Sequence, residues 1–185
     1  MESKTNERDL TRRMALKGAA GVALGAAGLA AAGSAASAQS ATPTAGAGVA
    51  PTFMLTAEGA MTIQQAAVAK AQEISVPEVV AIVDASGTLK ALLRMDGAPF
   101  ASIDVAMDKA YTSASFQAPT DQFAKNVSAD PVVMASILKV PHISLLAGGY
   151  PIMSGDTLIG AIGCSGGSGE QDQVCAQAGL AALGG

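Results

Sequence analysis

The chain has 185 residues, of which 50% are hydrophobic and 14% charged, and its net charge at pH 7 is −4. The negative charge and the scarcity of aromatic residues argue against nucleic-acid binding, which depends on neutralising phosphates. One His and two Cys are too few for a zinc site of four protein ligands within one chain. Cys164 and Cys175 leave two alternatives, a disulfide or two buried thiols, and their expected places on a strand and a helix favour the thiols.

The N-terminal 38 residues are typical of a twin-arginine export signal. Arg12 and Arg13 lie in a charged segment, and the apolar residues 18–32 that follow carry no charge. Ala36-Ser37-Ala38 has the small-x-small form of a cleavage site. The apolar run is too short for a membrane span, so we expect no stable membrane anchor. The sequence predicts a periplasmic or secreted protein, with a signal over 1–38, a flexible linker over 39–52 and one domain over 53–185.

The domain is predicted to alternate between helices and two β-hairpins. Apolar periodicity indicates a helix from Thr56, as N-cap, to Ile74. The β-branched run 79–83 is typical of a strand buried on both faces, and a second strand over 88–94 completes the hairpin. The later elements are a helix over 101–116, one or two short helices over 119–138 split near Pro131, a hairpin over 150–153 and 157–164, and a helix over 168–183. This order predicts an α+β domain with an antiparallel sheet covered by helices.

The expected helix 101–116 has three stripes. The core stripe holds Ile103, Met107, Ala110 and Ala114, and the solvent stripe holds Asp104, Asp108, Tyr111 and Ser115. In the third stripe, Lys109 and Thr112 lie between apolar residues. This pattern suits an apolar pocket with one cation for a carboxylate, and a lysine that reaches the surface is the alternative.

The glycine-rich stretch 161–172, AIGCSGGSGEQD, contains a G-x-S-x-G pattern. A serine nucleophile is excluded because His142 precedes Ser165, whereas hydrolases with this elbow place the histidine after the serine. A phosphate loop is disfavoured because carboxylates occupy the expected first helical turn. Ser168 and Gln171 instead form a capping-box pattern. The density of glycines leaves two explanations open, a backbone wall for a flat ligand or a tight subunit contact.

Several collinear motifs resemble the GlcG/HbpS-like haem-binding (haem-degrading domain) family. They are IVDASG (82–87), RMDGAP (94–99), KAYT (109–112), GGYPI (148–152), GAIGCSGG (160–167) and EQD (170–172). The resemblance covers residues 55–183. It implies a profilin-like fold, with about five antiparallel strands flanked by helices, and a homo-oligomer. Ser86, Tyr150 and Cys164 depart from the commoner residues of these motifs.

The resemblance also implies a function. We expect an exported, oligomeric protein that binds haem, or another tetrapyrrole, in haem handling or redox sensing, with a sensor protein as a further partner. No C-x-x-C-H occurs, so attachment would be non-covalent. Arg94 and Lys109 are expected at the propionates, with Asp96 as a further residue of the binding site. The alternative for Arg94 is pairing with Asp96 or with a neighbouring subunit. Thr112 or His142 is expected at the iron. Gly166 and Gly167 would form a backbone wall, and the remaining candidate ligands are Met95, Met107 and Tyr111.

Two further hypotheses stay open, and the sequence does not decide whether the protein is an enzyme. One is a cofactor-free lyase, isomerase or deaminase acting on a small carboxylated metabolite, with Lys109 as acid or base, aided by Asp96 or Glu170. The other is an oligomeric scaffold in which the glycines serve subunit packing.

Overall fold

β1 (Val79–Asp84) is one of the two inner strands of the sheet, and its residues 79–83 are fully buried, as the β-branched run predicts. The computed structural model describes residues 52–184. β1 pairs antiparallel with β2 (Leu89–Arg94) and with β4 (Thr157–Ser165), and β3 (Gly149–Ser154) pairs with the other side of β4. The described sheet therefore has four strands in the order β2-β1-β4-β3, rather than about five.

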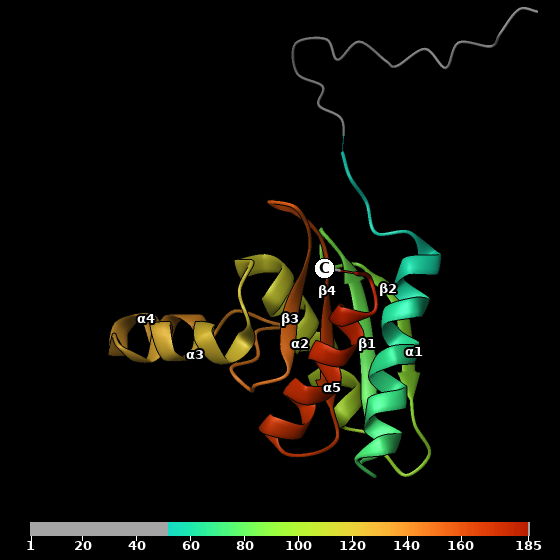
Figure 1. The fold of residues 1–185 in the computed structure, drawn as a ribbon. Helices are drawn as coiled ribbons and strands as arrows, with labels where there is room; N and C mark the ends of the chain where they lie inside the picture. The colour runs from blue at the N-terminus through green and yellow to red at the C-terminus, as the bar shows by residue number, and fades with distance from the viewer. Residues whose placement is uncertain (1–51, 185) are drawn as a thin grey trace, which may run out of the picture. The chain divides into compact units, whose positions relative to one another are not determined.

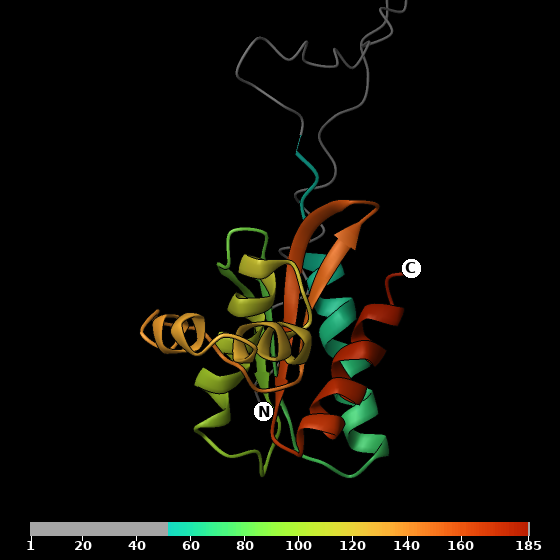
Figure 2. The ribbon, with the colours of Figure 1, turned by 90° about the vertical axis from the view of Figure 1, so that its left-hand side faces the viewer.

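Helices cover both faces of this sheet. α1 (Ala57–Glu73) and α5 (Gly169–Ala181) pack against each other on one face, and α2 (Ser102–Phe116) covers the other (Figures 1 and 2). α3 (Thr120–Ser128) and α4 (Pro131–Ile137) follow α2 and lead to the second hairpin. The predicted α+β architecture is confirmed, with the break between α3 and α4 at Pro131.

The strand residues of β1 divide between the two helical layers. Val80 and Ile82 belong to the core shared with α1 and α5, whereas Val79 and Ala81 pack with Ala106 of α2. Successive side chains of a strand point to opposite faces, so helices on both faces require a continuous apolar run. This is why the strand lacks the alternation of a half-exposed strand.

The helix starts follow the capping signals in the sequence. The hydroxyl of Thr56 accepts a hydrogen bond from the Gly59 amide at 3.0 Å. Ser168 and Gln171 form the predicted capping box at the start of α5. Val174 does not belong to the buried side of α5 and is 40% exposed. The residues that α5 buries are Asp172, Cys175, Ala176 and Gly179.

Three further expectations concern the N-terminal segments, a membrane span and the two cysteines. The predicted export signal and nearly all of the linker lie outside the described residues. Among residues 52–184, no helix has the length and apolar character needed to cross a membrane. Cys164 and Cys175 are both buried and unpaired, as favoured from the sequence.

Candidate functional site

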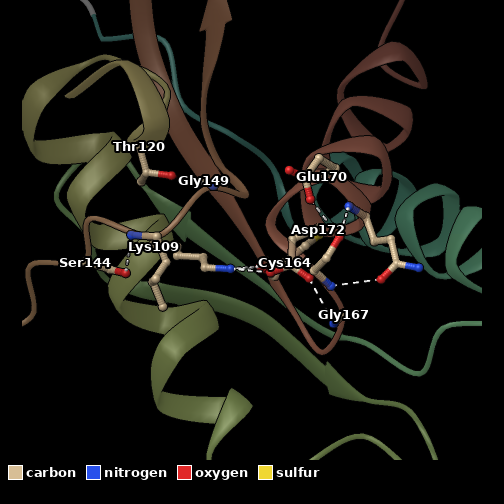
Figure 3. Close-up of polar contacts among 11 residues, drawn as sticks. Lys109, Thr120, Ser144, Gly149, Cys164, Gly167, Glu170 and Asp172 are labelled. Atoms are coloured by element: carbon tan, nitrogen blue, oxygen red, sulfur yellow. Dashed lines mark hydrogen bonds and ion pairs between the residues drawn. The ribbon is translucent and has the colours of Figure 1, made fainter. Parts of the chain in front are cut away.

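Lys109 is the largest side chain that the fold buries almost completely, with 1% of its surface exposed. Its Nζ atom lies 2.5 Å from Asp172 Oδ2 and donates a second hydrogen bond to the carbonyl of Cys164 at 2.8 Å (Figure 3). The other oxygen of Asp172 accepts a hydrogen bond from the Gly167 amide at 3.0 Å. Lys109 therefore links α2 to α5 through the end of β4, and its ammonium does not reach the surface.

Glu78 is the second buried acid of this region, immediately before β1, and it is fully buried. Neither of its carboxyl oxygens has a hydrogen-bond partner among the described residues. Burial, and then the negative charge of Asp172, raises the pKa of Glu78 to about 8. The structure therefore contains a buried cluster of three ionisable groups, Glu78, Lys109 and Asp172, which we call the carboxyl–lysine cluster.

Glycines make room for this cluster. A Cβ atom on Gly148 would lie 2.6 Å from the Asp172 side chain and 3.1 Å from Lys109 Nζ. A Cβ atom on Gly166 would collide with the carbonyl oxygen of Pro77 and would lie 2.9 Å from the Cα atom of Glu78. The density of glycines thus has a third explanation besides a ligand wall or a subunit contact, namely close packing of backbone within the chain.

His142 lies at the mouth of a cavity of about 230 Å³ beside α2. The cavity, which we call the His142 pocket, is lined by Gly87, Met107, Asp108, Tyr111 and His142. His142 Nδ1 lies 3.2 Å from Asp108 Oδ1, and the Tyr111 ring packs edge-on against the imidazole with centroids 5.8 Å apart. A carboxylate accepts a hydrogen bond, so Nδ1 carries the proton in the neutral ring and Nε2 keeps its lone pair.

Thr112 holds the loop of His142 rather than lining the pocket. Its buried hydroxyl accepts a hydrogen bond from the Ser144 amide at 2.8 Å and donates one to the carbonyl of His142 at 3.3 Å. His142 itself has a φ of 64°, which is uncommon for a residue with a side chain. Asp108 and Thr112, one helical turn apart, thus hold the ring and the backbone of His142 respectively.

Arg94 and Asp96 lie in a third place, an open groove of about 420 Å³ between α1 and β2. The lining residues of this groove are Val68, Gln72, Leu93, Arg94, Met95 and Asp96. Arg94 donates a hydrogen bond to the carbonyl of Ala98 at 2.8 Å. The structure records no ion pair between Arg94 and Asp96.

The seven residues predicted for one site are therefore distributed over three places. Lys109, Gly166 and Gly167 belong to the surroundings of the carboxyl–lysine cluster, Thr112 and His142 to the pocket and its loop, and Arg94 and Asp96 to the groove. Their roles toward a ligand stay predictions. Residues 52–184 contain no group of three or more His, Cys, Asp or Glu side chains that could hold a metal ion together.

Sequence reasoning missed Glu78 and Asp172 and assigned Asp108 to solvent. One signal for Asp172 was available, because it lies three and four residues before the buried Cys175 and Ala176, on the same face of a helix. Asp108 is three and four residues before Tyr111 and Thr112, so these three share a face too. No local signal shows that the loop of His142 returns to this face.

Known proteins that are similar to this chain identify its family. A family model described as "Haem degrading protein HbpS-like" matches residues 55–181. The chain belongs to the HbpS-like family. An uncharacterised 15.0 kDa protein of Citrobacter freundii, from the dhaT-dhaS intergenic region, is 34% identical over 127 residues, which are 68% of this chain and 89% of that protein.

Two solved structures are similar to this HbpS-like chain throughout the domain. A double mutant of Streptomyces reticuli HbpS is 34% identical with a TM-score of 0.69, over 88% of this chain and 100% of that one. A structure described as a PduOC:haem complex is 35% identical with a TM-score of 0.66, over 71% of this chain and 96% of that one. Corrinoid adenosyltransferase PduO of Salmonella typhimurium is 37% identical over 123 residues, but these are only 36% of its length.

Proposed function

We propose that this HbpS-like protein binds haem non-covalently at the His142 pocket, with His142 Nε2 as the protein ligand to iron. The observation that carries the proposal is the contact of 3.2 Å between His142 Nδ1 and Asp108. Histidines that bind metals typically donate their second ring N–H to such a partner, which fixes the tautomer and the ring orientation. The side chain of His142 is 69% exposed, so a ligand reaches Nε2 without opening the core.

The walls of the His142 pocket suit a flat, largely apolar group. Met107 and the Tyr111 ring supply apolar surface, and Tyr111 is itself packed against Gly87, where a Cβ atom would lie 2.8 Å from the ring. Bound haem would supply a redox-active iron. The structure described as a PduOC:haem complex, whose chain is 35% identical to this one, supports the proposal.

The size of the His142 pocket supports an oligomer. Its volume of about 230 Å³ is below the roughly 300–1,000 Å³ of pockets that enclose drug-sized ligands. One protomer would therefore cover only part of a macrocycle, and a second copy of the chain would cover more. Lys109 is buried in its pair with Asp172, and Arg94 does not line this pocket. A propionate contact of Arg94 thus requires a neighbouring copy.

Export by the twin-arginine route and a role in haem handling or redox sensing complete the proposal. The support for export is the pattern of residues 1–38, with Arg12-Arg13 and Ala36-Ser37-Ala38. Fractionation of cells that produce the tagged full chain tests it. Accumulation in the cytoplasm, with no shortening by the length of the signal, would contradict export.

The experiment for haem is a hemin titration of the purified protein, followed by its Soret absorption. We expect a saturable Soret shift for the wild-type protein, and a weaker, displaced Soret band for His142→Asn. Asn is the preferred substitution because it tolerates the left-handed backbone of position 142 better than Ala. Added free imidazole should restore the wild-type spectrum.

Two results would contradict parts of this proposal separately. A titration of the wild-type protein without saturation at micromolar hemin would overturn haem binding itself. Wild-type affinity and an unchanged Soret position in His142→Asn would overturn the role of His142 and leave haem binding intact.

A further inference from the structure

The carboxyl–lysine cluster contains two carboxyl groups, of Glu78 and Asp172, but only one ammonium group, of Lys109. Asp172 uses one oxygen for Lys109 and the other for the Gly167 amide, so both of its oxygens have a hydrogen-bond partner. Glu78 is fully buried beside it, and both of its oxygens lack a partner among the described residues. A buried carboxylate without hydrogen bonds or a counter-ion is very costly, and such a group takes up a proton instead.

We propose that Glu78 stays protonated in the native protein at neutral pH, and that its ionisation in mild alkali loosens the glycine-rich connection between β4 and α5. This inference does not depend on haem binding. It concerns residues that do not line the His142 pocket.

The groups that face Glu78 come from three elements. α5 contributes Asp172 and Cys175, α2 contributes Lys109, and β4 contributes Cys164. On the α1 side, the charge of Lys70 acts on Cys175. Lys109 is the ammonium that acts on Glu78, and it is already bound to Asp172.

Glu78 is the group of this cluster whose proton is lost near pH 8. Burial and the neighbouring Asp172 raise its pKa to about 8, and the charge of Lys109 offsets this only in part. Burial raises the pKa of Cys175 to about 12 and that of Cys164 well above its usual range. The two thiols therefore stay protonated between pH 6 and 9, so they do not contribute to the pH dependence of unfolding.

The glycine-rich connection is the segment whose opening would hydrate the ionised carboxylate of Glu78. Gly166 packs directly on the backbone of Pro77 and Glu78, and the Gly167 amide is held by Asp172. Gly167 is exposed, whereas residues 79–83 of β1 and 160–165 of β4 are buried. Opening at Gly166–Gly167 would bring water to an ionised Glu78 and separate it from Asp172 without exposing the apolar core.

The direction of the pH effect follows from proton binding. Between about pH 4.5 and pH 8 the unfolded chain has lost the proton of Glu78 and the folded chain has kept it. Raising the pH therefore favours unfolding, and this group increases the unfolding equilibrium constant by up to about tenfold per pH unit in that window. Below about pH 4.5 the contribution vanishes, and above pH 8 it is constant.

The test compares the wild-type protein with Glu78→Gln, and with Glu73→Gln as a matched control on exposed α1 surface, where the Glu73 side chain is 68% exposed. Urea unfolding at pH 5 to 9 should show the pH-dependent loss in wild type and in Glu73→Gln, and a much flatter profile in Glu78→Gln. Hydrogen exchange of peptides over residues 163–173, corrected for intrinsic rates, should accelerate as the pH rises from 5 to about 8 in wild type and not in Glu78→Gln.

Three outcomes overturn the inference. The first is a pH profile of Glu78→Gln that parallels wild type. The second is an infrared spectrum of wild type at pH 7 without a protonated-carboxyl band, a measurement that needs no variant to fold. The third is a corrected hydrogen-exchange rate over residues 163–173 that does not change with pH. This outcome would show that the glycine-rich connection does not loosen. If Glu78→Gln does not fold, Glu78→Met removes the titrating group with an apolar side chain of similar length.

Discussion

Lys109 and Asp172 lie 63 positions apart in the sequence, and their side chains meet at 2.5 Å in a part of the protein that water does not reach. One side chain comes from the helix on one face of the sheet, and the other from a helix on the opposite face (Figure 3). The pair therefore joins the two helical layers around the end of β4. Removing this ion pair by substitution tests how much it contributes to the stability of the whole domain.

Replacing Lys109 by Met should destabilise the protein by about 3–5 kcal/mol. The substitution leaves Asp172 buried without its counter-ion and beside a second carboxyl group, the situation in which loss of one partner is most costly. Urea unfolding at pH 7 measures it. The matched control is Lys125→Met, which breaks an exposed pair with Asp121 and should change stability by less than about 1 kcal/mol. Equal, small effects of both substitutions would show that the buried pair is dispensable.

Replacing Asp108 by Asn should weaken hemin binding by about 10- to 100-fold, the usual effect of losing the partner that orients a metal-bound histidine. The protein should remain folded, because Asp108 is only half-buried. Hemin titration and the reduction potential of the bound iron measure the effect. Asp104→Asn, one turn earlier on the same helix and exposed, is the control and should bind hemin like wild type. A wild-type affinity and potential in Asp108→Asn would rule out the orienting role.

Replacing Thr112 by Val distinguishes an anchor from an iron ligand. We expect a loss of about 1–3 kcal/mol, because the amide of Ser144 and the carbonyl of His142 lose their shared hydroxyl. Thr112→Ser should recover most of this stability. Thermal unfolding gives the stability, and the Soret spectrum reports the ligand. If Thr112→Val displaced the Soret band and left the stability unchanged, Thr112 would be a ligand, as the family resemblance suggested.

Replacing Gly166 by Ala should destabilise the protein by more than about 1 kcal/mol, since the added Cβ atom would collide with the carbonyl oxygen of Pro77, which is backbone and cannot rotate away. Gly169→Ala, in the first turn of α5, is the control. Its Cβ atom would lie 3.3 Å from that of Ala147, and the higher helix propensity of Ala offsets this crowding. Urea unfolding compares the two. A harmless Gly166→Ala would favour the ligand-wall explanation of this glycine.

The two thiols should be unreactive in the native protein and free in the unfolded one. Both Cys164 and Cys175 are fully buried, and burial raises the pKa of each thiol. Mass spectrometry after iodoacetamide treatment should show no modification under native conditions. In denaturant without a reducing agent, two modifications per chain are expected. Two modifications that appear only after reduction would instead demonstrate a disulfide.

Local signals predicted the elements of the fold well. The cap at Thr56, the capping box at Ser168 and the break at Pro131 all lie where the sequence places them. Such signals act between residues a few positions apart, so the sequence displays them directly. The buried side of α5 was not predictable in the same way. Most of its side chains are small or polar, and their hydrophobic periodicity carries little information.

The sequence predicted candidate site residues but not the contacts that they make. The sequence singled out Lys109 and Thr112 as polar residues between apolar ones, and the lone His142 as a candidate ligand. Their partners were not identified, because Asp172 and the His142 loop reach α2 from distant parts of the chain. The same limit applies to Glu78, whose position before a strand does not show that it is buried beside another carboxyl group.

The sequence by itself determined the family, the order of helices and strands, and the residues that are chemically out of place. Only the tertiary structure decided that Lys109 pairs with Asp172 and that Asp108 contacts the ring of His142. The physical reason is the range of the interactions. Caps, turns and periodicity are properties of neighbouring residues, whereas burial and charge pairing depend on which helix faces the packing of layers brings together.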